Sequence, residues 1–199
     1  MTATINASTS SGIVQTADTS GALALQSNGT TKLTVDSTGA YGQLISGTAV
    51  ASTSGTSIDF TGIPSWVKRV TVMFNGVSTN GSSLLQIQIG AGSVTTTGYV
   101  SSNVGGTTGN VLGGSASTTG FTVTNFTGAA YTATGSFVIS TIGSNTWIET
   151  GILITDTLAN AYMSSGRITL GGTLDRVRIT TVNGTDTFDA GSINIIYEG

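Results

Sequence analysis

Polar and apolar residues alternate along most of the chain, which is the pattern of β-strands that bury one face. Residues 67–75 (VKRVTVMFN) place Val70, Val72 and Phe74 on one face, and residues 84–89 repeat the pattern. Further runs of this kind cover residues 43–51, 57–60, 120–125, 135–142, 148–155, 167–170, 174–182 and 192–197. Turn residues separate them at intervals of about 8–12 residues, as in sandwiches and barrels.

These runs predict an all-β fold, an antiparallel β-sandwich of jelly-roll-like type. The Asn-Gly pairs at 75–76, 80–81 and 183–184 are expected in tight turns at strand ends, because such turns need positive φ. The strongest helical pattern is one or two turns over residues 157–163. Residues 90–120 are of low complexity, and two structures are predicted for them: an exposed functional loop or short irregular strands.

The first 42 residues differ from the rest because their apolar residues are few and each is flanked by Ser, Thr, Asn or Gly. Residues 22–26 and 31–36 bracket the sequence Ser-Asn-Gly-Thr at 27–30. An Asn-Gly pair between alternating apolar positions is the strongest short-range signal for a β-hairpin. The hairpin would place four apolar side chains on one face: Leu23, Leu25, Leu33 and Val35.

A single hairpin is only marginally stable in water, so we expect its apolar face to be covered by another copy of the chain or by a partner. The four apolar residues are the candidate contacts. The chain is accordingly divided into an N-terminal attachment or oligomerisation segment, residues 1–42, and a β-sandwich domain, residues 43–199. No ligand-binding residue is assigned.

Composition removes several classes of function. The chain has 199 residues, no His and no Cys, and 6 basic against 9 acidic residues give a net charge of −3. Disulfides and catalysis by His or Cys are therefore excluded, and no basic surface is expected for nucleic acid or an anionic membrane. The chain starts without a signal peptide pattern and contains no 18-residue apolar run, so we expect no membrane insertion.

No catalytic, metal or cofactor site is predicted. Most carboxylates occupy predicted strand ends or turns, where Asp accepts backbone hydrogen bonds. Asn183, Asp186 and Asp189 offer oxygens at three-residue intervals, which favours a plain turn over a hard-cation site. A serine nucleophile would need Lys32 or Lys68 as its base, and neither stands in an S-x-x-K sequence. We therefore expect no enzyme.

Four further side chains have alternative interpretations. Arg176 and Arg178 alternate with apolar residues and predict a solvated or interface face, with ligand binding as the lesser option. Trp66 is expected to pack in the core or in a turn. Trp147 follows a Gly-Ser-Asn sequence, so it either packs or lies at a loop tip and stacks on a sugar ring, and packing is favoured.

Two segments resemble parts of structural proteins of tailed bacteriophages. Residues 5–42, INASTSSGIVQTADTSGALALQSNGTTKLTVDSTGAYG, resemble a short β segment of the type LQSNGTxxLTVDxxG. Residues 56–90, TSIDFTGIPSWVKRVTVMFNGVSTNGSSLLQIQIG, resemble a segment of phage fibre-like and surface proteins. The resemblance implies a non-catalytic virion component, commonly a homotrimer, with an N-terminal attachment segment and a β-sandwich displayed outward.

Such modules occur on heads and on tails, so two functions stay open. The first is a capsid decoration or cement protein whose hairpin contacts the major capsid protein, another virion protein or sister chains. The second is a tail-fibre or receptor-binding module that recognises host surface glycans through loops such as 90–120 and through Trp147. In both, the expected location is the virion, after synthesis in the cytoplasm of a bacterial host.

Overall fold

The chain forms two compact units, residues 1–43 and residues 44–199. The computed structural model describes residues 23–27, 29–36, 39–41, 44–106, 112–124, 129, 131–156 and 160–199. The division between the units falls one residue from the predicted domain boundary. Residues 1–22 of the predicted attachment segment lie outside the described residues.

The N-terminal unit is a hairpin with a third strand beside it. Its strands, in the order β1-β2-β3, are β1 (Leu23–Ser27), β2 (Thr30–Asp36) and β3 (Gly39–Tyr41). β1 and β2 are antiparallel and pair Leu23 with Val35 and Leu25 with Leu33. Gly29 has a φ of +72°, the left-handed conformation that glycine supplies in hairpin turns. The predicted N-terminal hairpin is confirmed.

The second unit, which we call the body, contains two antiparallel sheets. The larger sheet has nine strands in the order β11-β10-β15-β14-β13-β7-β17-β4, and β5 also pairs with β17. Its strands are β4 (Leu44–Ser46), β5 (Val50–Ala51), β7 (Arg69–Thr79), β10 (Val100–Gly106), β11 (Leu112–Ser117), β13 (Ala133–Gly143), β14 (Thr146–Thr155), β15 (Asn160–Thr169) and β17 (Phe188–Glu198).

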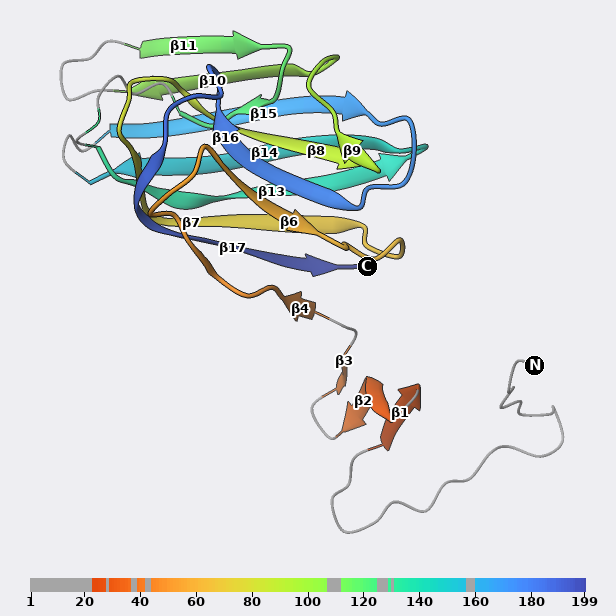
Figure 1. Ribbon diagram of the computed structural model, residues 1–199. Helices are drawn as coiled ribbons and strands as arrows, with labels where there is room; N and C mark the ends of the chain where they lie inside the picture. Colours follow the sequence, from red (N-terminus) through yellow and green to blue (C-terminus); the bar gives the residue numbers. More distant parts are fainter. Residues whose placement is uncertain are drawn as a thin grey trace, which may run out of the picture. The chain divides into compact units, whose positions relative to one another are not determined.

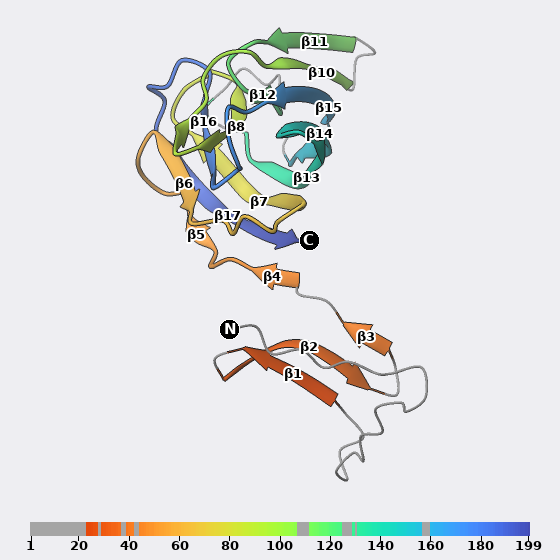
Figure 2. The ribbon, with the colours of Figure 1, turned by 90° about the vertical axis from the view of Figure 1, so that its right-hand side faces the viewer.

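The smaller sheet has five strands in the order β12-β8-β16-β6, with β9 paired to β8. Its strands are β6 (Ser57–Thr61), β8 (Leu85–Ala91), β9 (Ser93–Val94), β12 (Phe121–Thr122) and β16 (Arg176–Thr181). In Figure 1 the smaller sheet lies in front of the larger one, and Figure 2 shows the larger sheet curving around it. Buried apolar side chains of both sheets form one core between them. The predicted antiparallel β-sandwich is confirmed.

Alternation along the strands explains which residues enter the core. In β7, Val70, Val72 and Phe74 are buried, as predicted. The ring of Phe74 packs edge-on against Phe137 of β13, with ring centroids 5.6 Å apart. β8 also buries its predicted apolar positions, but the glutamines between them are buried too, so its outer face is covered.

The predicted helical turn over residues 157–163 is wrong where the structure describes it. Residues 160–163 begin β15 and alternate between buried and exposed, with Asn160 and Tyr162 inside. This segment pairs with β14 on one side, and from Ala161 onward with β10 on the other, so neighbouring strands satisfy its backbone. Residues 157–159 lie outside the described residues.

Most of the described residues within 90–120 lie in strands. β10 pairs with β15 and β11 pairs with β10, which settles the choice in favour of short strands for the described part. The Asn103 side chain supports this arrangement, because its amide nitrogen donates to the Thr124 carbonyl at 2.7 Å and its oxygen accepts from the Ser115 backbone at 3.1 Å. Residues 107–111 lie outside the described residues.

Several strand boundaries differ from the prediction. The Asn-Gly pair at 75–76 does not end a strand: β7 continues to Thr79, and the register against β13 and β17 shifts there. Gly76 has a φ of +61°, so the pair forms a bulge inside the strand. The described part of the predicted strand over 43–51 is two short strands, β4 and β5. Of the described residues in 120–124, Phe121 and Thr122 form a strand, β12.

Candidate functional sites

The four predicted contact residues lie together on one face of the β1–β2 hairpin. Leu23 and Leu25 are 42% and 41% exposed, and Val35 is 38% exposed. Leu33 is half-buried. Because each leucine of β1 stands opposite an apolar residue of β2, the side chains form a continuous stripe. We call it the hairpin stripe. Large apolar side chains exposed together in this way are typical of contact surfaces.

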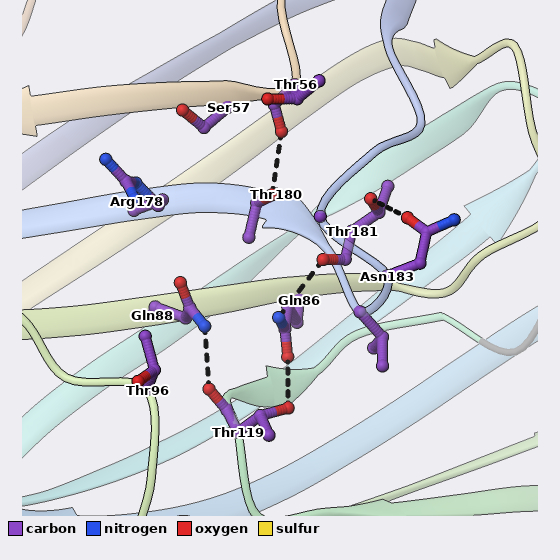
Figure 3. A pocket seen from close by; sticks show the side chains of 12 residues that line it. Thr56, Ser57, Gln86, Gln88, Thr96, Thr119, Arg178, Thr180, Thr181 and Asn183 are labelled. Atoms are coloured by element: carbon purple, nitrogen blue, oxygen red, sulfur yellow. Dashed lines mark hydrogen bonds between the residues drawn. The ribbon is translucent and has the colours of Figure 1, made fainter.

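A polar pocket of about 310 Å³ lies on the outer side of the smaller sheet. Its lining is made almost entirely of hydroxyl, amide and guanidinium side chains, as Figure 3 shows. The lining residues are Thr56, Ser57, Gln86, Gln88, Thr96, Thr119, Arg178, Thr180, Thr181, Val182, Asn183 and Gly184. Two of them, Thr96 and Thr119, come from the 90–120 segment that the sequence singled out.

The two glutamines of β8 are fixed by hydrogen bonds inside this pocket. The Gln86 amide accepts from the Thr119 hydroxyl at 3.0 Å and donates to the Thr181 carbonyl at 3.3 Å. The Gln88 amide nitrogen donates to the Thr119 carbonyl at 2.9 Å, and Figure 3 shows these contacts on both sides of Thr119. An amide held through its nitrogen keeps an oxygen that can accept from a bound hydroxyl group.

Arg178 supplies the charge at the pocket edge. Its Nε and Nη2 atoms donate to the two carboxylate oxygens of Asp59 at 2.7 and 2.9 Å. This hydrogen-bonded contact raises the pKa of Arg178 above its ordinary value. The pair is neutral overall, so the pocket favours a polar ligand that forms many hydrogen bonds. None of the lining residues is aromatic, and a sugar would therefore bind here without ring stacking.

Neither tryptophan lies in this pocket. Trp147 is 4% exposed and belongs to the core within β14, so the alternative of a sugar-stacking loop tip is wrong. Its ring faces the interior because residue 147 shares the inward face of β14 with Leu153. Trp66 is 37% exposed and lies against Tyr197, with ring centroids 6.0 Å apart, which agrees with packing in a turn.

The Asn183–Asp186 segment forms a hydrogen-bonded turn. Asn183 accepts from the Thr185 backbone at 3.0 Å and donates to one Asp186 oxygen at 2.6 Å. The other Asp186 oxygen accepts from the Ser83 backbone at 2.8 Å. Both carboxylate oxygens therefore have protein donors. Within the described part of the chain, no cluster of three or more His, Cys, Asp or Glu side chains is arranged to hold a metal ion.

The sequence did not single out Glu149 as an interior group. Its side chain is fully buried in β14, and one oxygen accepts from the Ser164 hydroxyl at 2.6 Å. The other oxygen has no hydrogen-bond partner. Burial raises the pKa of Glu149 from 4.5 to about 7, against the smaller opposing effect of Ser164. A carboxyl enclosed in this way has no access to a substrate, so its effect is on stability.

Comparisons with protein-family models, with curated proteins and with solved structures find no match to this chain. Among the described residues, no helix has the length and apolar character needed to cross a lipid bilayer. Function therefore has to be inferred from the chain's own residues.

Proposed function

We propose that this chain is a non-catalytic structural protein of a tailed-phage virion, namely a capsid decoration or cement protein anchored by its N-terminal segment. The observation that supports this proposal most directly is the hairpin stripe. It belongs to a unit whose described part is only three short strands, too little structure to enclose apolar side chains. A capsid surface or a sister chain would cover it.

The size of the stripe bears on how the anchor would work. Fully burying one Leu or Val side chain contributes about 1.5–3 kcal/mol, and Leu23, Leu25 and Val35 are each roughly two-fifths exposed. Covering the three exposed side chains would then contribute about 2–4 kcal/mol, which is weak for a single contact. A homotrimer that presents several stripes together would bind far more firmly, because linked sites act at high effective concentration.

The test is attachment to particles. We expect Leu25→Lys/Val35→Lys to lower the amount of full-length chain bound to virions at least tenfold, because two ammonium groups would enter the contact. Ala24→Lys is the control, since residue 24 is exposed and lies between Leu23 and Leu25 on β1, on the other face of the hairpin. Equal binding of the two variants would contradict the proposal.

Copy number distinguishes the head from the tail. Quantitative mass spectrometry of purified virions should find hundreds of copies of a decoration protein, against a few or a few dozen copies of a tail-fibre protein. If the chain is missing from the virion, both proposals are wrong.

A second function is supported by the polar pocket. A tail-fibre or receptor-binding module would use it to bind host surface glycans through hydroxyl and amide groups, and the 90–120 segment contributes two of its threonines. We expect Gln88→Ala/Thr96→Ala to weaken binding of host oligosaccharides at least fivefold in calorimetry. Ser102→Ala, on the larger sheet, is the control. Wild-type chain that binds none of the host oligosaccharides would exclude this function.

The proposal includes no catalytic role. Among the described carboxylates, Asp59, Asp175 and Glu198 are paired with arginines, and Glu149 is enclosed in the core. A polysaccharide hydrolase needs two carboxyl groups facing a substrate. Reducing ends released from host polysaccharide by the wild type, and lost on changing an Asp or Glu, would contradict this.

A further inference from the structure

The outer face of the larger sheet carries a second apolar surface. Its side chains come from three adjacent strands, β14, β15 and β10, and each is 36–57% exposed. They are Val100, Val104, Ile148, Ile152, Ile154 and Met163. We call this surface the sheet patch. A folded chain rarely leaves so many large apolar side chains together on one sheet unless something covers them.

Strand register makes the patch continuous. Met163 of β15 stands opposite Ile152 of β14 on one side and opposite Val104 of β10 on the other. Side chains opposite each other on one face of a sheet are about 5 Å apart, close enough to touch. The row through Ile152 and Met163 therefore forms the centre of the patch.

One charge stands at each end of the patch. Arg167 follows Met163 by four residues on β15, and Asp156 follows Ile152 by four residues at the end of β14. Because β14 and β15 are antiparallel, these two residues lie on opposite sides of the central row, each about 14 Å from it. The patch is thus positive at one end and negative at the other.

Arg167 differs from the other arginines. Arg69, Arg176 and Arg178 each form an ion pair with a carboxylate of this chain. Arg167 has no such partner in the part of the chain that the structure describes, although it lies in a shallow depression beside Val100 and Ile148. In a chain with so few charges, an unpaired arginine beside an apolar patch is suited to a carboxylate of another molecule.

We propose that two copies of this chain pack face to face through the sheet patch, related by a two-fold axis that runs along the Ile152–Met163 row. This rotation carries the Asp156 end of one copy onto the Arg167 end of the other, so opposite charges meet twice. Ile152 and Met163 then face their own counterparts across the axis. Sheets packed in this way lie about 10 Å apart and interdigitate their side chains.

The contact is expected to be modest in size. The three strands β14, β15 and β10, over the length from Ile148 to Asp156, offer about 400 Å² of sheet surface per copy. Standard interfaces bury about 800 Å² per partner, so the pair should exchange rapidly in solution. A covalent trap is therefore a better assay than a measurement of mass.

The chain has no cysteine, so Ile152→Cys introduces a unique thiol on the proposed axis. Treating the full-length variant with a short bismaleimide should give a covalent dimer in a denaturing gel several-fold faster than Val182→Cys, an exposed control on the smaller-sheet side of the body. The experiment contains no virion, so its result is independent of the proposed function. Equal rates for the two variants would overturn the proposal.

Exchange of the charges tests the geometry. In the Ile152→Cys background, Arg167→Asp should slow cross-linking several-fold, because carboxylates would then meet carboxylates. Adding Asp156→Arg should restore the rate. Circular dichroism of each variant confirms that it is folded. Cross-linking that is insensitive to Arg167→Asp, or that is not restored in the double variant, would show that the copies do not meet in this orientation.

Discussion

The buried carboxyl of Glu149 makes the stability of the body depend on pH, and Glu149→Gln should remove that dependence. The carboxyl has one hydrogen-bond donor, Ser164, and one oxygen without a partner. Ionising it in the folded protein leaves a negative charge with little compensation, whereas in the unfolded chain the charge is hydrated. A glutamine has nearly the same shape and no charge at any pH in this range.

The sign and size follow from the two pKa values. Glu149 has an ordinary pKa of 4.5 and a pKa of about 7 in the folded protein. Below pH 4.5 both states are neutral and nothing changes. Between pH 4.5 and 7 only the unfolded chain loses the proton, so stability falls as pH rises, and above pH 7 the loss is complete. At about 1.4 kcal/mol per pKa unit, the loss amounts to about 3 kcal/mol.

The assay is urea unfolding of the wild type and Glu149→Gln at pH 4.5 and pH 8. From pH 4.5 to pH 8, the wild type should lose about 3 kcal/mol of unfolding free energy relative to Glu149→Gln, equivalent to about 10 °C in melting temperature. Ser164→Ala should make the wild-type dependence steeper, since Ser164 lowers the pKa of Glu149. A difference between wild type and Glu149→Gln that is the same at both pH values would refute the reasoning.

Three other changes test the packing of the body, with urea midpoints as the measurement. Gly135→Ala should lower the free energy of unfolding by about 1–3 kcal/mol, because its Cβ would lie 2.2 Å from the Ile152 carbonyl oxygen. Gly171→Ala is the control and should leave it unchanged, because its Cβ would meet open space. Phe137→Ala should cost about 3–5 kcal/mol, since the ring is fully buried, and a loss below 1 kcal/mol would contradict its place in the core. Tyr99→Phe should cost about 1–3 kcal/mol, because the buried hydroxyl accepts from the Ile89 backbone at 2.8 Å; an unchanged midpoint would contradict this.

The fold class could be predicted because its signals are local. Alternation identified β7 and β8, and the Asn-Gly pair identified the hairpin between β1 and β2. The exact pairing of Leu23 with Val35 comes from the structure. The start of β15 was missed for the opposite reason. Ala161 and Tyr162 fit a short helix by spacing, and only pairing with β14 and β10 shows that the segment is a strand.

The candidate sites depend on contacts between distant parts of the chain. Gln86 and Gln88 alternate with buried apolar residues, a pattern that predicts exposure to solvent. In the structure Thr119 covers them, and nothing in the sequence indicates this contact. Glu149 alternates with isoleucines in the same way. Its inward direction is set by which face of β14 meets the smaller sheet, a property of the whole sandwich rather than of the strand.

The two apolar surfaces suggest how such a chain would assemble. Each is weak alone, the hairpin stripe because it is small and the sheet patch because it is modest in area. They belong to different units of the chain, so the two surfaces share no residue. When several weak contacts are linked, occupancy rises steeply with the number of copies held together. Copies held side by side on a repeating surface would therefore pair through the sheet patch more readily than free chains, whose pairing is weak.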